Sequence, residues 1–205
     1  MQVNLNKAFL QGALECAAKR DIRNYLMGVC LDFVNDTEVV YIGTDGHVMF
    51  IAKETLVEST GISLGTQIVI PRASLEMALK NCTKPHTSLT LEKLEGDTYK
   101  LGGSVIFTPI EAQYPNYKRM IPKESNGLAC QFLPEVIVKV HKAFKHITGQ
   151  HPYFYPNGDS EASVFQDSKR TDFLVVAMPF KSQTGLNSYK PWVSPVPPEE
   201  LKQAA

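Results

Sequence analysis

The chain has 205 residues, of which 43% are hydrophobic and 20% are charged, a composition typical of one large or two small globular domains. Lysine plus arginine equals aspartate plus glutamate at 21 each, which excludes a strongly basic nucleic-acid binder, so any DNA contact must come from a local basic face. The sequence has no apolar run near the ~18 residues of a membrane span and no signal-peptide core at its start, so we expect a cytoplasmic protein.

The first predicted unit is a strand, a helix and two more strands. Gln2 to Leu5 alternates like a short strand, and Asn6 suits the cap of a following helix. Apolar residues then recur at helical spacing from Ala8 to Lys19. Strands follow at Tyr25 to Asn35 and Glu38 to Ala52, with turn-forming residues between them.

The pattern then begins again. Gln67 to Pro71 predicts a strand, and Ala73 to Lys80 predicts a helix with its apolar residues on one side. Three further strands are expected, at Ser88 to Leu94, Tyr99 to Leu101 and Ser104 to Thr108.

A third pass follows the same order. Ala129 to Phe132 predicts a short strand, and Pro134 suits the first turn of a helix that runs to about His146. Strands are expected near His151 to Tyr155, Ala162 to Gln166 and Phe173 to Met178. Passes roughly 60 residues apart predict an internal structural repeat, although the residues themselves are not self-similar.

Catalytic and metal-binding motifs are missing from the sequence. It contains no His-Glu-x-x-His motif and no glycine-rich phosphate loop, and its four cysteines are widely spaced, so we expect no metal and no cofactor. Thr44-Asp45-Gly46-His47 brings together a hydroxyl, a carboxylate and an imidazole. Asp-Gly between apolar strands is typical of a hairpin turn, which we favour, and an enzyme that uses Asp45 and His47 stays an alternative.

Four segments of the chain form an ordered series. They are Arg20-Asp21-Ile22-Arg23-Asn24-Tyr25-Leu26-Met27-Gly28-Val29, Thr44-Asp45-Gly46-His47-Val48-Met49, Ile70-Pro71-Arg72 and Tyr114-Pro115-Asn116-Tyr117-Lys118-Arg119-Met120-Ile121-Pro122. This series resembles the central domain of the bacterial DNA sliding clamp, the beta subunit of DNA polymerase III. That family typically carries a TDGHRL turn, a PR pair before its second helix and a FPDYRRVIP segment. Phe173 to Phe180 also resembles the YVVMPM that closes the family's last domain.

The resemblance implies an α+β fold, the DNA-clamp fold, built from repeated βαβββ units with antiparallel sheets outside and helices inside. Residues 1–122 would form a clamp domain of two units, and residues 123–181 would form half of a second domain. Residues 182–205 contain several prolines and predict an extended or disordered tail. Family chains hold three domains of two units each, so this chain resembles a shortened clamp, of phage, prophage or chromosomal origin.

A clamp encircles duplex DNA and tethers a polymerase to it without catalysing a reaction. The resemblance therefore implies a processivity factor whose partners are double-stranded DNA, a DNA polymerase, other proteins with clamp-binding motifs and a clamp loader. A ring of about twelve helices with three helices per chain predicts a homo-oligomer of four copies. The alternative is a clamp-derived interaction module that binds peptides but does not encircle DNA.

The resemblance also implies an apolar groove for partner peptides, in which flexible methionines would adapt to varied sequences. Its residues would be Leu26, Thr44, Gly46, His47, Met49, Pro115, Arg119, Met120, Met178, Pro179 and Phe180. Read without the resemblance, Leu26 and Met120 are equally typical of a core. Position 48 is valine where the family usually has arginine, which removes a cation beside the proposed pocket.

A basic helical face would lie toward the DNA. Its residues would be Lys7, Lys19, Arg20, Arg23, Lys139, Lys142, Lys145 and His146. In the third helix, Ile137, Val140 and Phe144 predict an apolar stripe opposite these cations. A solvated helix surface is the alternative for the lysines.

Overall fold

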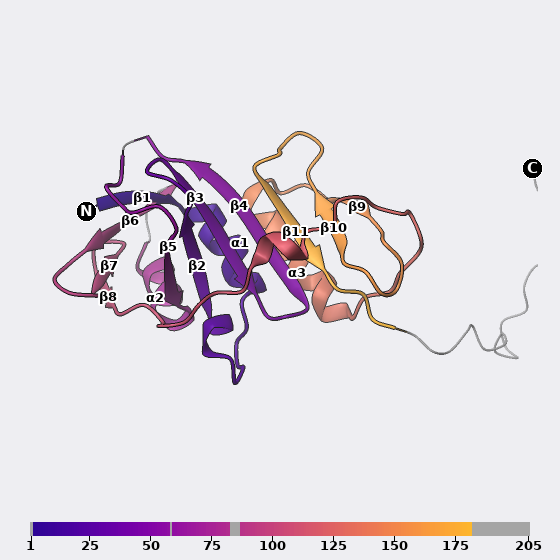
Figure 1. Cartoon of the computed structure of the whole chain (residues 1–205), viewed down its shortest axis with the longest axis horizontal. Coiled ribbons are helices and arrows are strands. Elements are labelled where there is room, and N and C mark those ends of the chain that lie inside the picture. The colour runs from indigo at the N-terminus through magenta and orange to yellow at the C-terminus, as the bar shows by residue number, and fades with distance from the viewer. Residues whose placement is uncertain (1, 58, 83–86, 182–205) are drawn as a thin grey trace, which may run out of the picture.

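The structure is a computed structural model that describes residues 2–57, 59–82 and 87–181. Its described part holds three helices and two antiparallel sheets, and the helices lie behind the sheets in the view of Figure 1. None of these helices is long and apolar enough to cross a membrane. The tail beyond residue 181, predicted to be extended or disordered, lies outside the described residues.

The first unit consists of β1 (Gln2–Asn6), α1 (Lys7–Cys16), β2 (Gly28–Phe33), β3 (Glu38–Thr44) and β4 (Val48–Thr55). The Asn6 side chain caps α1 as predicted, because it accepts hydrogen bonds from the N–H groups of Ala8 and Phe9 at 3.0 and 3.2 Å. The helix is shorter than predicted, since Ala17 is already extended. A 3-10 turn, η1 (Asn24–Met27), delays the next strand to Gly28.

The second unit consists of β5 (Thr66–Pro71), α2 (Arg72–Asn81), β6 (Ser88–Lys93), β7 (Tyr99–Leu101) and β8 (Val105–Phe107). Arg72 ties this unit to the first, because its guanidinium donates to the carbonyls of Leu14 and Ala17, both at 2.9 Å. These carbonyls lie at the end of α1, where no further helical N–H is available to them.

The two units exchange their first strands. One sheet has the order β1-β6-β7-β8, and the other has the order β5-β2-β3-β4 before it continues into the third unit. The first strand of each unit thus pairs with the second strand of the other unit, β1 with β6 and β5 with β2. All pairs are antiparallel, so the predicted α+β fold with antiparallel sheets is confirmed.

The third unit extends the larger sheet. It consists of α3 (Pro134–Ile147), β9 (Tyr153–Tyr155), β10 (Ser163–Gln166) and β11 (Phe173–Ala177). β11 pairs with β4, so that Val176 lies opposite Met49, and a seven-stranded sheet results. On the helical side, α3 packs along α1, and its Phe144 ring lies 5.0 Å from that of Phe173.

The strand predicted at Ala129 to Phe132 is wrong, because this segment forms no strand. The carbonyl of Leu128 accepts from the Gly158 N–H at 3.0 Å, and the carbonyl of Gln131 accepts from the Phe180 N–H at 2.8 Å. The segment therefore crosses the end of the part of the sheet that β9, β10 and β11 form. In the first two units the leading strand pairs with the sheet of the other unit, and no such partner for the third unit is present among the described residues.

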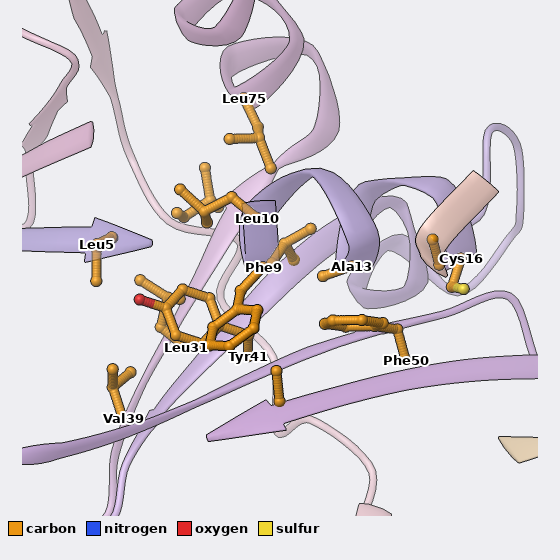
Figure 2. Packing of buried hydrophobic residues seen from close by; sticks show 14 of the residues in the cluster. Leu5, Phe9, Leu10, Ala13, Cys16, Leu31, Val39, Tyr41, Phe50 and Leu75 are labelled. Carbon is orange, nitrogen blue, oxygen red and sulfur yellow. The ribbon is translucent and has the colours of Figure 1, made fainter. Parts of the chain in front are cut away.

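The main core lies between the helices and the sheets. Figure 2 shows Phe9 of α1 directed toward the strands, with its ring 5.5 Å from that of Tyr41. Leu75 of α2 joins the same cluster from the other side. The close approach of α1 to β3 requires a glycine, because a Cβ at Gly43 would lie 1.9 Å from the Ala13 carbonyl oxygen.

The apolar stripe predicted on α3 needs correction. Val140 and Phe144 are buried as expected, and Val136 and Ala143 complete the buried side. Ile137 is 43% exposed, because it lies one position away from that side.

The outer face of the large sheet is covered by the chain that leaves β8. This segment contains a short 3-10 turn, η2 (Tyr117–Met120). Tyr114 and Tyr117 are buried there in a second apolar cluster with Ile42 and Met49. The Tyr117 hydroxyl donates to the buried carboxylate of Asp32 at 3.0 Å. The sheet is therefore packed on both faces, and the segment is fixed to it by a buried hydrogen bond.

The first prediction concerns the helix-sheet approach. Gly43→Ala should lower the free energy of unfolding by at least about 2 kcal/mol, because the new methyl group overlaps the backbone of Ala13. Urea unfolding measures the change. Gly61→Ala is the control, since a Cβ there meets nothing within 4 Å and carries only the cost of a φ of +65°, about 1 kcal/mol. Equal losses in the two variants would contradict the packing argument.

The second prediction concerns the buried hydrogen bond. Tyr117→Phe should cost about 1–3 kcal/mol of unfolding free energy, because Asp32 loses the donor that its buried carboxylate uses. Tyr114→Phe is the matched control: its hydroxyl is buried and has no hydrogen-bond partner among the described residues, so its removal should not lower stability. A Tyr117→Phe protein as stable as the control would show that this bond does not anchor the segment.

Candidate peptide-binding groove and DNA-facing helices

The turn between β3 and β4 is held by its own polar groups. The Thr44 hydroxyl donates to the Val48 carbonyl at 2.8 Å and accepts from the Gly46 N–H at 3.1 Å. One Asp45 oxygen accepts from the N–H groups of His47 and Val48 at 2.8 and 3.0 Å. Gly46 has a φ of +93°, which favours glycine. The predicted hairpin turn is therefore confirmed.

The other Asp45 oxygen forms an ion pair with Lys139 of α3. Burial is the largest single influence on the pKa of Asp45 and raises it, but the Lys139 ammonium and the two backbone N–H groups together outweigh burial and leave the pKa below its ordinary value. Asp45 meets the backbone of His47, and no bond joins its carboxylate to the imidazole. The contacts of Asp45 thus join the turn to the third unit and do not form an acid-base pair.

The chain after β11 returns to this turn. The Met178 N–H donates to the His47 carbonyl at 2.8 Å, so the first unit and the third unit are linked at this point. In the sheet, Met49 lies opposite Thr44 on one side and opposite Val176 on the other. Three adjacent strands therefore supply neighbouring side chains to one small area of the outer face.

A cavity of about 220 Å³ lies over this area. Eight of the eleven predicted groove residues line it, namely Leu26, Thr44, Gly46, His47, Met49, Pro115, Met120 and Met178. The other three, Arg119, Pro179 and Phe180, do not. Leu26 and Met49 are buried at its base, whereas Met120 is 48% exposed at its edge.

Six further residues, which were not predicted from the sequence, also line the cavity. They are Arg23, Tyr25, Val48, Tyr114, Tyr117 and Val176. Side chains alternate between the two faces of a strand, so Val176 shares a face with Met178. Val176 could therefore have been predicted from the sequence. The two tyrosines belong to the segment that crosses the sheet, where both are buried and Tyr117 is hydrogen-bonded to Asp32.

Arg23 was assigned to the DNA-facing set, but the structure places it at the groove. A Cβ at Gly46 would lie 3.2 Å from its guanidinium. Arg23 also holds Asp21 through two hydrogen bonds of 2.9 Å, and these bonds lower the pKa of Asp21 to about 2. A cation therefore stands beside the turn even though position 48 is a valine, whose side chain is buried.

The groove also contains a buried polar atom. The Tyr114 hydroxyl has no hydrogen-bond partner among the described residues. Burial raises the pKa of Tyr114, so the group stays protonated and neutral. A buried hydroxyl of this kind is costly unless a bound molecule or a small shift of the chain satisfies it.

Several predicted DNA-facing cations are engaged within the protein. Lys142 and His146 of α3 both approach Glu15 of α1, at 3.7 and 3.3 Å, and Lys139 is paired with Asp45 as described above. The hydrogen bond from His146 lowers the pKa of Glu15. These acidic neighbours lie far away in the sequence, so the spacing of α3 alone did not reveal them.

The remaining predicted cations are more open. Lys19, Arg20 and Lys145 are exposed and form no ion pair with any described residue. Lys7 lies at the start of α1, with its ammonium 3.5 Å from the Cys82 carbonyl. Across the ranges that the structure covers, no group of three or more histidine, cysteine or acidic side chains is placed to hold a metal ion.

Comparisons with known proteins place these features in a known fold. The sequence matches no protein-family model and no curated protein. The structure is similar to the DNA polymerase sliding clamp from Pseudomonas aeruginosa, with 14% identity, a TM-score of 0.67 and coverage of 89% of this chain and 67% of that one. It is also similar to the DNA polymerase III beta chain from Streptococcus pneumoniae, with 14% identity, a TM-score of 0.69 and coverage of 89% and 65%.

A third similar structure is the Helicobacter pylori beta clamp bound to a DNA ligase peptide, with 13% identity, a TM-score of 0.69 and coverage of 88% of this chain and 66% of that one. This chain thus spans about two thirds of the length of the clamps that it matches. Structural similarity at identities this low establishes the fold alone. The chain therefore has the fold of the bacterial DNA sliding clamp, the beta subunit of DNA polymerase III, over about two thirds of that clamp's length.

Proposed function

We propose that this protein is a clamp-like processivity factor in the cytoplasm, which holds duplex DNA against its helices and binds short peptides of replication proteins in the groove over β4 and β11. One observation carries the proposal: the Thr44–Val48 turn, the segment around Pro115 and the Met178 segment, far apart in sequence, together enclose one largely apolar cavity. No catalytic step is part of the proposal.

The lining of the groove indicates the chemistry of its ligand. Leu26, Met49 and Val176 form an apolar base, and the flexible side chains of Met120 and Met178 stand at its edge. A cavity of about 220 Å³ has room for roughly one or two apolar side chains. Arg23 at the rim can pair with a carboxylate of the same peptide, and the Tyr114 hydroxyl can accept or donate one hydrogen bond.

The helical side suits weak contact with DNA. A ring that is linked topologically to a duplex needs only enough positive charge to tolerate the phosphates. Lys19, Arg20 and Lys145 supply charge that no internal ion pair neutralises within the described residues. Because Lys142 and Lys139 pair with Glu15 and Asp45, we expect a contact that is weak and easily screened by salt.

Encirclement requires several copies. The junction of β4 with β11 joins the last strands of two units, and β8 is another last strand with no neighbour on one side among the described residues. β8 lies at the far end of the molecule from β9 in Figure 1. Pairing at β8 would let copies continue into a ring, for which the count of helices favours four copies, opened by a clamp loader.

The second candidate is an interaction module that binds peptides and does not encircle DNA. The pairing of Lys139 and Lys142 with acidic residues favours it, because these pairs reduce the positive charge of the helical side. The groove is common to both candidates, and only the behaviour on DNA separates them.

Met178→Glu should weaken peptide binding at least tenfold, because a carboxylate at the edge of an apolar cavity opposes burial of apolar side chains. The probe is a fluorescent peptide from the C-terminus of the cognate replicative polymerase, and fluorescence anisotropy gives its Kd. Met77→Glu is the matched control, since Met77 is 56% exposed on α2, away from the groove. Unchanged affinity in Met178→Glu would argue against the groove.

Retention on DNA tests encirclement. After loading with the cognate loader, the protein should stay on a closed circular duplex during gel filtration at moderate salt and should leave it once a restriction enzyme linearises the circle. A closed ring can leave DNA only over a free end, whereas a protein that only contacts the DNA surface dissociates equally from circular and linear DNA. Equal loss of the protein from circular and linear DNA, with peptide binding intact, would reject the processivity factor and favour the interaction module.

A further inference from the structure

The third unit lacks two things that both other units have. Its leading segment, residues 129–133, pairs with no strand, and one edge of β9 has no neighbouring strand among the described residues. We propose that a second copy of this chain supplies both, so that each copy lays residues 131–133 along β9 of the other and the two third units complete one clamp domain about a two-fold axis.

The argument begins with the pairing rule that the first two units obey. In each, the leading strand runs antiparallel to the second strand of the other unit, and the residue just before the helix lies opposite the first residue of that strand. Asn6, before α1, lies opposite Ser88, and Pro71, before α2, lies opposite Gly28. The same geometry therefore occurs twice in one chain.

This rule predicts a register for the third unit. Leu133 precedes α3 and Tyr153 begins β9, so the expected pairs between copies are Leu133 with Tyr153, Phe132 with Phe154 and Gln131 with Tyr155. The second of these pairs can be compared with the existing ones, which are Leu5 with Leu89 and Ile70 with Val29. All four residues of these pairs are buried in the core beneath the helices. Two phenylalanines at the equivalent position fit that environment.

The exposed surface agrees with this register. Tyr153, Phe154 and Tyr155 are 57%, 43% and 44% exposed, although an aromatic strand of this kind usually lies inside a sheet. β9 carries no charged side chain, and an uncharged open edge invites pairing with another chain. Leu133 and Ile137 at the start of α3 are also exposed, so apolar surface continues from the strand edge onto the helix.

The single chain already contains one contact of the exchanged form. The Phe132 ring packs 5.7 Å from the rings of both Phe154 and Phe165, while its backbone crosses the end of the sheet. Exchange replaces this contact by the same contact from the second copy and adds backbone hydrogen bonds, which is the usual basis of domain swapping. A formal charge of zero means that two copies do not repel each other strongly.

A second copy is favoured over another partner because the need is reciprocal. Each copy has one unpaired leading segment and one open β9 edge, so a two-fold axis satisfies both with one type of interface. The other open edge, β8, is a last strand, and where last strands of two units pair within the described residues, they pair with each other, as β4 does with β11. The exchange itself is argued from strand pairing. It rests on the clamp-like function proposed above only for what it would achieve, because half a domain would interrupt a ring.

The mass of the chain in solution is the first measurement. Light scattering after gel filtration should give twice the 22.8 kDa chain mass, or a larger even multiple. Tyr153→Lys together with Tyr155→Lys places charges on the open edge and should halve this mass, while circular dichroism and peptide affinity stay unchanged because the groove lies over β4 and β11. A strict monomer at the highest soluble concentration would overturn the proposal.

Disulfide trapping tests the register. Copies carrying Gln131→Cys are mixed with copies carrying Tyr155→Cys, both with Cys82→Ser and Cys130→Ser, and oxidised. Opposed residues of antiparallel strands have Cα atoms about 4.5–5.5 Å apart, within the range of a disulfide. A two-chain product should form in the mixture and in neither protein alone.

The matched control replaces Tyr155→Cys by Ile106→Cys, on the exposed side of β8. A product with Ile106→Cys and none with Tyr155→Cys would show head-to-tail association and overturn the exchange. Peptide affinity and retention on circular DNA are measured separately, so a protein that forms the exchanged pair and binds neither ligand would refute the function and leave this inference standing.

Discussion

The pairing of β11 with β4 is the contact on which both proposed binding surfaces depend. On the outer side it brings Val176 next to Met49 and leads Met178 back to the His47 carbonyl, which completes the groove. On the inner side it sets α3 along α1, where Lys142 meets Glu15. A shift of one residue in this register would turn every side chain of β11 to the opposite face. The same register therefore determines both the groove and the helical surface.

Polar groups reinforce this junction at places where burial makes them effective. The Asp45 carboxylate holds its own turn through two backbone N–H groups and reaches Lys139 of α3, so the turn and the third unit constrain each other. On the outer face, the bond from Tyr117 to Asp32 fixes the segment that forms one wall of the groove. A rigid base with flexible methionines at its edge suits a site that accepts related but unequal peptides.

Strand exchange explains why the third unit is incomplete by itself. In the first two units the leading strand pairs with the other unit and not with its own, so a unit without such a partner leaves one segment without a ladder and one edge without a neighbouring strand. The exchange proposed above accounts for both the exposure of Tyr153 and Tyr155 and the absence of a strand at Ala129 to Phe132. The unpaired state of that segment therefore reflects topology and not poor strand propensity.

Local chemistry was sufficient for most elements: the Asn6 cap, the Asp-Gly turn and the alternating strands are encoded by neighbouring residues, and short motifs led to most of the groove. Contacts between distant residues decided the rest. Arg23 lines the groove cavity, Lys142 is paired with Glu15, and Ile137 is exposed. Periodicity along one helix or strand reports which residues share a face, but it does not report what lies opposite that face. The partner across a face depends on how the strands of different units pair, and that order is set only when the whole chain folds.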